Sequence, residues 1–119
     1  MSKKLYETFR RSMLDKTDTW KDLLAEEVKL VGPLAAVEGK AAFIKVNEPF
    51  FASTRESQLH NLVENGNRII TQITTIVTAP DGETLALPVS EWYEFSEGKL
   101  TSLRVFFDTH EFRRRFGME

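Results

Sequence analysis

The clearest structural signal in this chain is the stretch Pro88-Val-Ser-Glu-Trp-Tyr-Glu-Phe-Ser-Glu-Gly-Lys-Leu-Thr-Ser-Leu-Arg-Val-Phe-Phe-Asp108-Thr-His-Glu-Phe112. Two runs in which apolar and polar residues largely alternate flank the turn dipeptide Glu97-Gly98. We therefore predict two antiparallel strands followed by a short helix. Side chains of a strand alternate between its two faces, and the residues that share a face with Glu91 are the apolar or aromatic Leu87, Val89 and Tyr93. Such a carboxylate is either an acid or base with a shifted pKa or a residue at the sheet edge that reaches water.

Two more strands precede this stretch. Asn65-Gly66-Asn67 is a strong hairpin signal because tight hairpin turns require positive φ angles, and the run after it is rich in Ile, Thr and Val. A second turn, Pro80-Asp-Gly-Glu83, follows that run. We therefore predict long strands over residues 57–64, 68–78, 84–95 and 100–107.

The first half of the chain is predicted to be mainly helical. Apolar residues recur at helical spacing over residues 5–14, 20–26 and 40–52, and Pro49 should kink the last of these helices or end it early. Brief strands are expected over residues 28–31 and 35–38. Helices followed by a long meander indicate an α+β fold, a single domain over residues 1–119, with the helices packed on one face of a curved antiparallel sheet.

Composition excludes several classes of function. The net charge of −2 offers no broad basic surface for nucleic acid, and we interpret the basic run Arg113-Arg-Arg115 as a solvated helix end. The chain has no cysteine and only two histidines, which lie far apart, so we expect no metal site and no cofactor. No apolar signal core follows Met1-Ser-Lys-Lys4 and no membrane span is present, which predicts a cytoplasmic protein without a membrane partner.

Four motifs carry a resemblance to a known family: Leu23-Leu-Ala-Glu-Glu-Val28, Val37-Glu-Gly-Lys-Ala-Ala-Phe43, Ser96-Glu-Gly-Lys-Leu100 and Arg104-Val-Phe-Phe-Asp108. Together with the order of elements they resemble the SnoaL-like group of the nuclear transport factor 2-like superfamily, which includes ketosteroid isomerases, limonene-type epoxide hydrolases and polyketide cyclases. The resemblance covers nearly the whole chain. It implies a cone-shaped half-barrel, a cystatin-like α+β roll with helices on the concave face, an apolar cavity lidded by helices, and a homodimer.

The resemblance does not carry over the catalytic sets of two of these enzyme classes. Epoxide hydrolases of this fold have Arg-x-Asp where this chain has Gln72-Ile-Thr74, and a second Asp at the position of Val105, so no carboxylate is available here to activate water. Ketosteroid isomerases have their general-base Asp where this chain has Gly32. Their oxyanion-hole acid corresponds to Glu91, and their oxyanion tyrosine lies on the first helix, where Tyr6 is the only tyrosine.

Glu91 and Tyr6 are therefore the candidate catalytic residues. Desolvation on an apolar wall should raise the pKa of Glu91, which would let it donate a hydrogen bond to a ligand carbonyl or exchange a proton near neutral pH. The structural alternative is an ion pair with a cation on a neighbouring strand, for example Arg104. Oxyanion stabilisation, if any, would come from Tyr6, Gln72 or Thr74.

The expected wall of the ligand pocket combines residues from helices and strands. Its aromatic members could instead be ordinary core, His60 could be a surface residue, and the face that carries Gln72 and Thr74 could be an ordinary sheet surface. The residues assigned to the pocket, besides Glu91, are Trp20, Phe43, Phe50, His60, Ile70, Gln72, Thr74, Leu87, Val89, Leu103, Val105 and Phe107.

Asp108 is the more conspicuous acid, but we assign it a structural role. Asp108-Thr-His-Glu111 is a near-ideal helix start, with Asp108 as the N-cap and Glu111 reaching back to it. Trp92 lies on the face opposite Glu91, where an exposed tryptophan would indicate a homodimer surface.

Two functions remain open at this point. One is an isomerase-like or cyclase-like enzyme that acts on a small apolar molecule through Glu91. The other is a module of the same fold that binds an apolar ligand, or serves as a dimer scaffold, without turnover.

Overall fold

The computed structural model describes residues 2–118. The helices over this range are α1 (Ser2–Leu14), α2 (Thr19–Asp22), α3 (Lys40–Ser53) and α4 (His110–Arg115). The strands are β1 (Leu24–Val31), β2 (Ala36–Glu38), β3 (Thr54–Asn65), β4 (Arg68–Thr78), β5 (Thr84–Ser96) and β6 (Lys99–Phe106). No helix within residues 2–118 is both long and apolar enough to cross a membrane.

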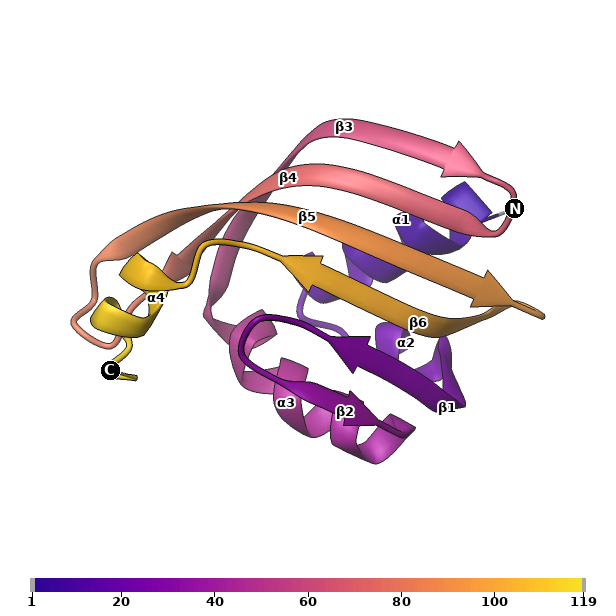
Figure 1. The fold of residues 1–119 in the computed structure, drawn as a ribbon, viewed down its shortest axis with the longest axis horizontal. Helices are drawn as coiled ribbons and strands as arrows, with labels where there is room; N and C mark the ends of the chain where they lie inside the picture. Colours follow the sequence, from indigo (N-terminus) through magenta and orange to yellow (C-terminus); the bar gives the residue numbers. More distant parts are fainter. Residues whose placement is uncertain (1, 119) are drawn as a thin grey trace.

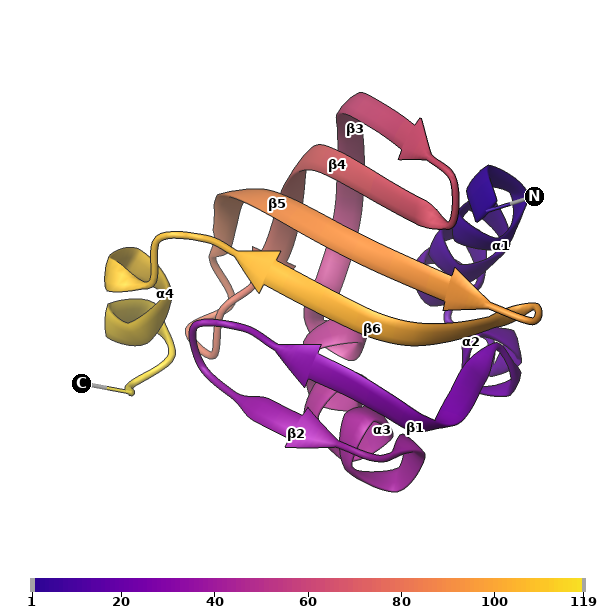
Figure 2. The same ribbon diagram turned by 45° about the vertical axis from the view of Figure 1, so that its right-hand side comes forward.

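The strands form one curved sheet in the order β2-β1-β6-β5-β4-β3. The helices α1, α2 and α3 lie on its concave side, and α4 lies at one end, beside the turn between β4 and β5 (Figure 1). Figure 2 shows that the sheet bends around the helices without closing into a barrel. The predicted α+β half-barrel is confirmed. The sheet is mixed rather than wholly antiparallel, because β1 pairs with β6 in parallel.

The strand β1 begins earlier than predicted, and α2 is only one turn long. We expected a helix to residue 26, but Leu24 already pairs with Leu100 of β6, whose N–H donates to the Leu23 carbonyl at 2.7 Å. From Leu24 onward the buried positions follow the sheet. Burial against β6 therefore overrides the local helical pattern in this segment.

The helix α3 runs through Pro49 to Ser53, where we expected a kink or an early end. Its last turn is supported by side chains, because the hydroxyls of Ser53 and Thr54 donate to the Phe50 carbonyl at 2.8 and 3.0 Å. The fully buried Phe43 anchors the first half of the helix in the core. Proline removes one backbone donor, and this packing outweighs that loss.

The turn at Glu97-Gly98 has positive φ at both positions, 52° and 76°, as a two-residue hairpin turn requires. A bulge follows, because the register shifts by one residue between the Phe95–Leu100 pair and the Glu94–Ser102 pair. As a result Glu91 lies opposite Val105, and Arg104 lies opposite Trp92. Without the bulge, Arg104 would face Glu91.

Two clusters of buried side chains fill the concave side. The larger joins α1, α2, α3 and β1 to the ends of β5 and β6 near the Glu97-Gly98 turn, and the smaller joins the other half of β4 and β5 to α4. Phe112 is the buried anchor of α4, and an Arg115–Asp81 ion pair at 3.7 Å links this helix to the β4–β5 turn. Between the two clusters the side chains leave a hollow.

The predicted capping box at Asp108 and Glu111 does not form. The helix begins at His110, with Thr109 in the N-cap position and no side-chain cap bond. Asp108 Oδ1 instead accepts from the His110 N–H at 2.9 Å, two residues on, and Glu111 pairs with Arg114 at 2.7 Å. Asp108 keeps a structural role as the acceptor of a local turn, an arrangement that aspartate favours.

Candidate functional site

A cavity of about 450 Å³ lies between the two buried clusters, under the concave face of the sheet. Aromatic rings make up much of its wall: Phe9, Phe50, Phe51, Tyr93, Phe107, Phe112 and Phe116. Among the described residues that line it, Glu91 is the only one with an ionisable carboxyl group, and none is a lysine, arginine or histidine. The volume is within the range of small-molecule sites, and the wall suits an uncharged ligand.

The carboxyl group of Glu91 is held by its neighbours on the sheet. Thr71 lies directly across from it on β4, and the Thr71 hydroxyl donates to Glu91 Oε1 at 3.1 Å. The Tyr93 hydroxyl, two residues along β5 on the same face, is a second hydrogen-bond partner of this carboxyl group. These contacts fix the orientation of Glu91 on the cavity wall.

Burial raises the pKa of Glu91 above its ordinary value, because a charged carboxylate loses its hydration in this apolar setting. The hydrogen bonds from Tyr93 and Thr71 and the charge of Arg10 oppose this increase without cancelling it. Glu91 therefore keeps its proton to a higher pH than a free glutamate does. A protonated carboxyl group can donate a hydrogen bond, which a carboxylate cannot.

Tyr6 lies behind the wall rather than on it. Its side chain is buried, with its ring packed edge-on against Tyr93 at a centroid distance of 5.0 Å. Its hydroxyl is hydrogen-bonded to Thr71, and burial together with the nearby Glu91 raises its pKa. Tyr6 thus reaches Glu91 through Thr71. The structure brings the two candidate residues together, but only Glu91 lines the cavity.

The cation near Glu91 is Arg10 of α1, not Arg104, which the bulge turns to the opposite face. The guanidinium of Arg10 donates from Nη2 to the Ser57 carbonyl at 2.7 Å. Within residues 2–118, Arg10 Nε is the one fully buried side-chain nitrogen or oxygen atom that has no hydrogen-bond partner. Its positive charge stabilises the ionised form of Glu91 from behind the wall.

The structure places five of the predicted pocket residues on the cavity: Phe50, Val89, Leu103, Val105 and Phe107. Three others are not on it. Trp20 and Phe43 belong to the larger buried cluster and Leu87 to the smaller one, and each is at most 4% exposed. These three fill the interior with their side chains and leave no free surface for a ligand.

Four predicted pocket residues lie on the convex face, away from the cavity: His60, Ile70, Gln72 and Thr74. His60 Nε2 is hydrogen-bonded to Thr74 Oγ1 at 2.7 Å, and Gln72 Oε1 accepts from Asn61 Nδ2 at 2.7 Å. Odd-numbered residues of β4 face the helices and even-numbered ones face outward. The prediction chose the wrong face because isoleucine occurs on both.

Several polar residues on or beside the cavity were not predicted from the sequence, among them Thr71, Thr75 and Asn47. A signal for the threonines was present. In the structure, Thr78 and Thr84 pair on either side of the β4–β5 turn. Continuing that register residue by residue along the two strands places Thr71 opposite Glu91. No comparable signal identified Asn47, because its role depends on how α3 is rotated against the sheet.

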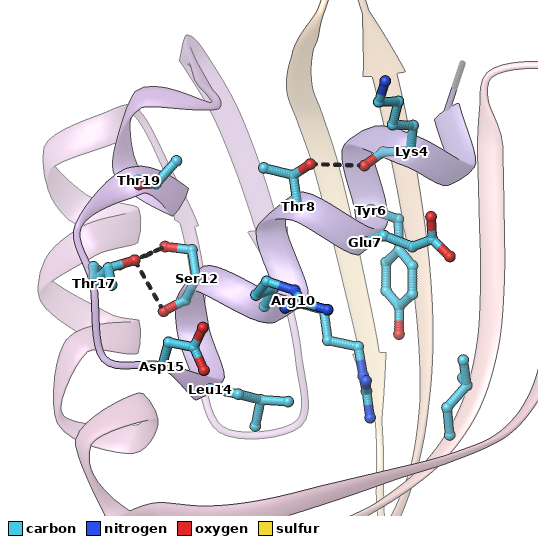
Figure 3. Close-up of a pocket in the computed structure, with 12 residues that line it drawn as sticks. Lys4, Tyr6, Glu7, Thr8, Arg10, Ser12, Leu14, Asp15, Thr17 and Thr19 are labelled. Carbon is cyan, nitrogen blue, oxygen red and sulfur yellow. Dashed lines mark hydrogen bonds between the residues drawn. The ribbon is translucent and has the colours of Figure 1, made fainter.

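A larger hollow of about 880 Å³ lies alongside α1 and reaches Leu59 of β3 (Figure 3). Residues of α1 and of the turn after it make up nearly all of its lining, among them the charged Lys4, Glu7, Arg11 and Asp15. Within the hollow Ser12 and Thr17 bond each other at 2.7 Å. This groove is more polar and more charged than the smaller cavity, and we place the candidate functional site at the smaller cavity, where a carboxyl group is desolvated.

Gly32 also lines the cavity. A Cβ atom there would lie 3.8 Å from Val105 Cβ, so a side chain would fit, but none is present. No group of three or more metal-binding side chains occurs within residues 2–118. The cavity therefore offers one carboxyl group and several neutral hydrogen-bonding groups.

Comparison with known proteins agrees with this architecture. A family model of the SnoaL-like domain matches residues 3–103. A search of curated proteins finds no match. Among solved structures, a protein from Kribbella flavida DSM 17836 is 19% identical with a TM-score of 0.84, over 94% of this chain and 90% of that chain.

Two other structures share the fold. TerC, co-crystallised with polyporic acid, is 18% identical with a TM-score of 0.82, over 98% of both chains. A candidate isomerase from Bacillus subtilis is 16% identical with a TM-score of 0.83, over 99% of this chain and 94% of that chain. At such identities these structures establish a common fold only. The family match over residues 3–103 does more: this chain belongs to the SnoaL-like family.

Proposed function

We propose that this protein binds a small, mainly apolar molecule in the cavity and that Glu91 forms the decisive polar contact with it. The observation that carries this proposal is a carboxyl group with a raised pKa on the wall of a largely aromatic cavity. With Thr71 donating to Oε1, a protonated Glu91 would donate a hydrogen bond to a ligand carbonyl oxygen. The absence of cations from the described lining argues against an anionic ligand.

In its enzymatic form, the proposal is isomerase-like or cyclase-like acid–base chemistry. Glu91 would protonate or hydrogen-bond a carbonyl oxygen as negative charge develops there, while Thr71 and Tyr93 hold the carboxyl group in place. Tyr6 would act through Thr71 as a positioning residue. The shared fold with a candidate isomerase and with TerC is compatible with such chemistry.

The alternative is a binding module without turnover. It is favoured by Gly32, which leaves the cavity without a second carboxyl group among the described lining residues. A proton transfer from carbon to carbon needs a base to remove the first proton. With a single carboxyl group, Glu91 would have to serve as that base as well as interact with the carbonyl oxygen.

Two measurements test the proposal. Nile red, an uncharged dye, should bind with increased and blue-shifted fluorescence, and Val105→Trp, which fills the cavity, should abolish binding. Equal binding to wild type and Val105→Trp would contradict the cavity site. For turnover, conversion of cyclohex-3-enone to its conjugated isomer should be accelerated by wild type and by the surface control Glu94→Gln but not by Glu91→Gln. Dye binding without this dependence on Glu91 would favour the binding module.

We also propose that the protein forms a homodimer through the convex face. Trp92 and Phe106 are 42% and 52% exposed there, and their rings contact each other at a centroid distance of 6.4 Å. Charges of both signs surround them, from Arg68, Glu94 and Arg104. A second copy related by a two-fold axis would cover the rings and present the opposite charges.

A further inference from the structure

Asn47 contributes a polar group to the cavity from the helical side. It lies in the middle of α3, is 9% exposed, and lines the cavity, whereas Glu91 lines it from the sheet. Asparagine is uncommon in the interior of a helix among apolar neighbours, because its side chain needs hydrogen-bond partners there. The arrangement of its carboxamide shows which of its atoms is available.

The orientation of the Asn47 side chain follows from a hydrogen bond. Its Nδ2 donates to the Phe43 carbonyl at 2.9 Å, and a carbonyl oxygen only accepts, so the amino group must point there. The other atom, Oδ1, accepts no hydrogen bond from any residue over the range 2–118. Within residues 2–118, the one fully buried side-chain nitrogen or oxygen atom without a hydrogen-bond partner is Arg10 Nε. The unpaired Asn47 Oδ1 is therefore not fully buried. The space that Asn47 lines is the cavity.

We infer that Asn47 Oδ1 is a ligand-binding acceptor and that it selects a ligand that carries a hydroxyl group. This inference rests on the proposed binding function of the cavity. An acceptor in an apolar wall favours a ligand with a donor and rejects an analogue that lacks it, because the acceptor would otherwise stay unpaired. A protonated amine is disfavoured, because a charged group would lose its hydration in this largely apolar cavity. A neutral aromatic molecule with a hydroxyl group satisfies both conditions.

The test uses a matched pair of probes, 2-naphthol and 2-methoxynaphthalene, which differ in whether the oxygen can donate. Dissociation constants are measured by NMR titration of wild type, Asn47→Leu, Glu91→Gln and Asn61→Leu. Asn61 lies on the convex face, so its variant is a matched control for the same substitution. Wild type should bind 2-naphthol about fivefold more tightly than 2-methoxynaphthalene, the effect of one hydrogen bond of about 1 kcal/mol. The preference should vanish in Asn47→Leu alone.

The outcomes separate this inference from the proposed function. If neither probe binds in the cavity, both the function and the inference are wrong. If both probes bind but the preference is absent from wild type, or is lost in Glu91→Gln and kept in Asn47→Leu, only the role of Asn47 is wrong. A measurement on wild type covers the case in which Asn47→Leu does not fold. The side-chain carbonyl ¹³C resonance of Asn47 should shift with 2-naphthol and stay in place with 2-methoxynaphthalene, and equal shifts would overturn the inference.

Discussion

Glu91 and Glu94 are three residues apart on β5 and have opposite surroundings. Glu94 lies on the convex face, where its Oε1 is 3.1 Å from Arg68 Nε and both side chains are well exposed. Glu91 lies on the concave face, hydrogen-bonded to Thr71, with a pKa raised by burial. The same residue type is a solvated ion-pair partner on one face and a desolvated acid on the other. The face of the sheet on which each glutamate lies, rather than its residue type, determines whether its carboxyl group is solvated or desolvated.

The same contrast recurs in neighbouring residues. Tyr93 is 3% exposed and hydrogen-bonded to Glu91, whereas the adjacent Trp92 is 42% exposed. On β4, Thr71 donates to Glu91, whereas Thr74 bonds the exposed His60. Each pair offers a matched experiment in which one substitution affects the inner face and the other affects the outer face.

The largest difference in the free energy of unfolding is expected between Tyr93→Ala and Trp92→Ala. Removing the buried ring of Tyr93 should lower the free energy of unfolding by about 3–5 kcal/mol, as for other large core aromatics. Removing the Trp92 ring should cost about 1 kcal/mol in the isolated monomer. Urea unfolding at low protein concentration measures both values. Similar losses for the two variants would mean that the faces do not differ in packing.

Substitutions on the convex face should affect homodimer formation more than they affect folding. We expect Trp92→Glu to weaken the proposed homodimer by about 2 kcal/mol or more, roughly 30-fold in the dissociation constant, because a charge would replace a central aromatic ring. Sedimentation equilibrium measures this shift. Lys99→Glu, at the end of β6 next to the Glu97-Gly98 turn, serves as the control for an added negative charge. A monomeric wild type would remove the basis for a convex-face interface.

The stability of the protein should depend on pH through Glu91. The folded protein keeps the Glu91 proton to a higher pH than the unfolded chain, because burial raises the folded-state pKa. This contribution to stability is complete below the unfolded pKa and is lost as the pH rises through the folded pKa. Glu91→Gln, which stays neutral, should therefore gain stability relative to wild type between pH 4 and pH 8, by about 1.4 kcal/mol for each unit of pKa shift.

Thermal unfolding across that pH range measures the gain, and Glu94→Gln is the control. Glu94 belongs to an exposed ion pair, so its replacement should change stability by less than about 1 kcal/mol. A Glu91→Gln variant whose stability follows the wild type at every pH would show that Glu91 titrates normally.

The smallest expected difference, in the pKa of Glu91 and in stability, is between Thr71→Val and Thr74→Val. Thr71 donates to Glu91 and thereby lowers its pKa, so Thr71→Val should raise that pKa further and cost about 1 kcal/mol of stability, the net value of one hydrogen bond. Thr74→Val should leave the Glu91 pKa in place, since Thr74 faces outward. Carboxyl ¹³C NMR titration measures both. An unchanged pKa in Thr71→Val would contradict the direct bond to Glu91.

Helical spacing and strand alternation together predicted the α+β architecture, and strand alternation predicted which residues share a face with Glu91. The alternation of Leu87, Val89, Glu91 and Tyr93 is unambiguous, and the structure keeps it. The alternation on β4 was ambiguous, because Ile69 and Ile70 occupy opposite faces, and this misplaced Gln72 and Thr74. Pairing register, which depends on turns and on the rest of the sheet, resolves that ambiguity.

Other features depended on interactions that local patterns do not encode. The bulge that turns Arg104 away from Glu91 inserts one residue into β6, and nothing in the local sequence requires it. Leu24 enters a strand because β6 is available to pair with it. The division between filled core at Trp20 and Phe43 and open cavity at Phe107 depends on how all the side chains pack together.

The parallel pairing of β1 with β6 also bears on how the chain folds. Leu24 and Leu100 lie at opposite ends of the sequence and are adjacent in the sheet. Bringing them together closes a loop that contains most of the chain, and such closure is slow compared with hairpin formation. During synthesis, β1 can pair with β2 early, but the other edge of β1 would stay unpaired until β6 has left the ribosome. The hairpins of β3, β4 and β5 would then form first, and the cavity would close last.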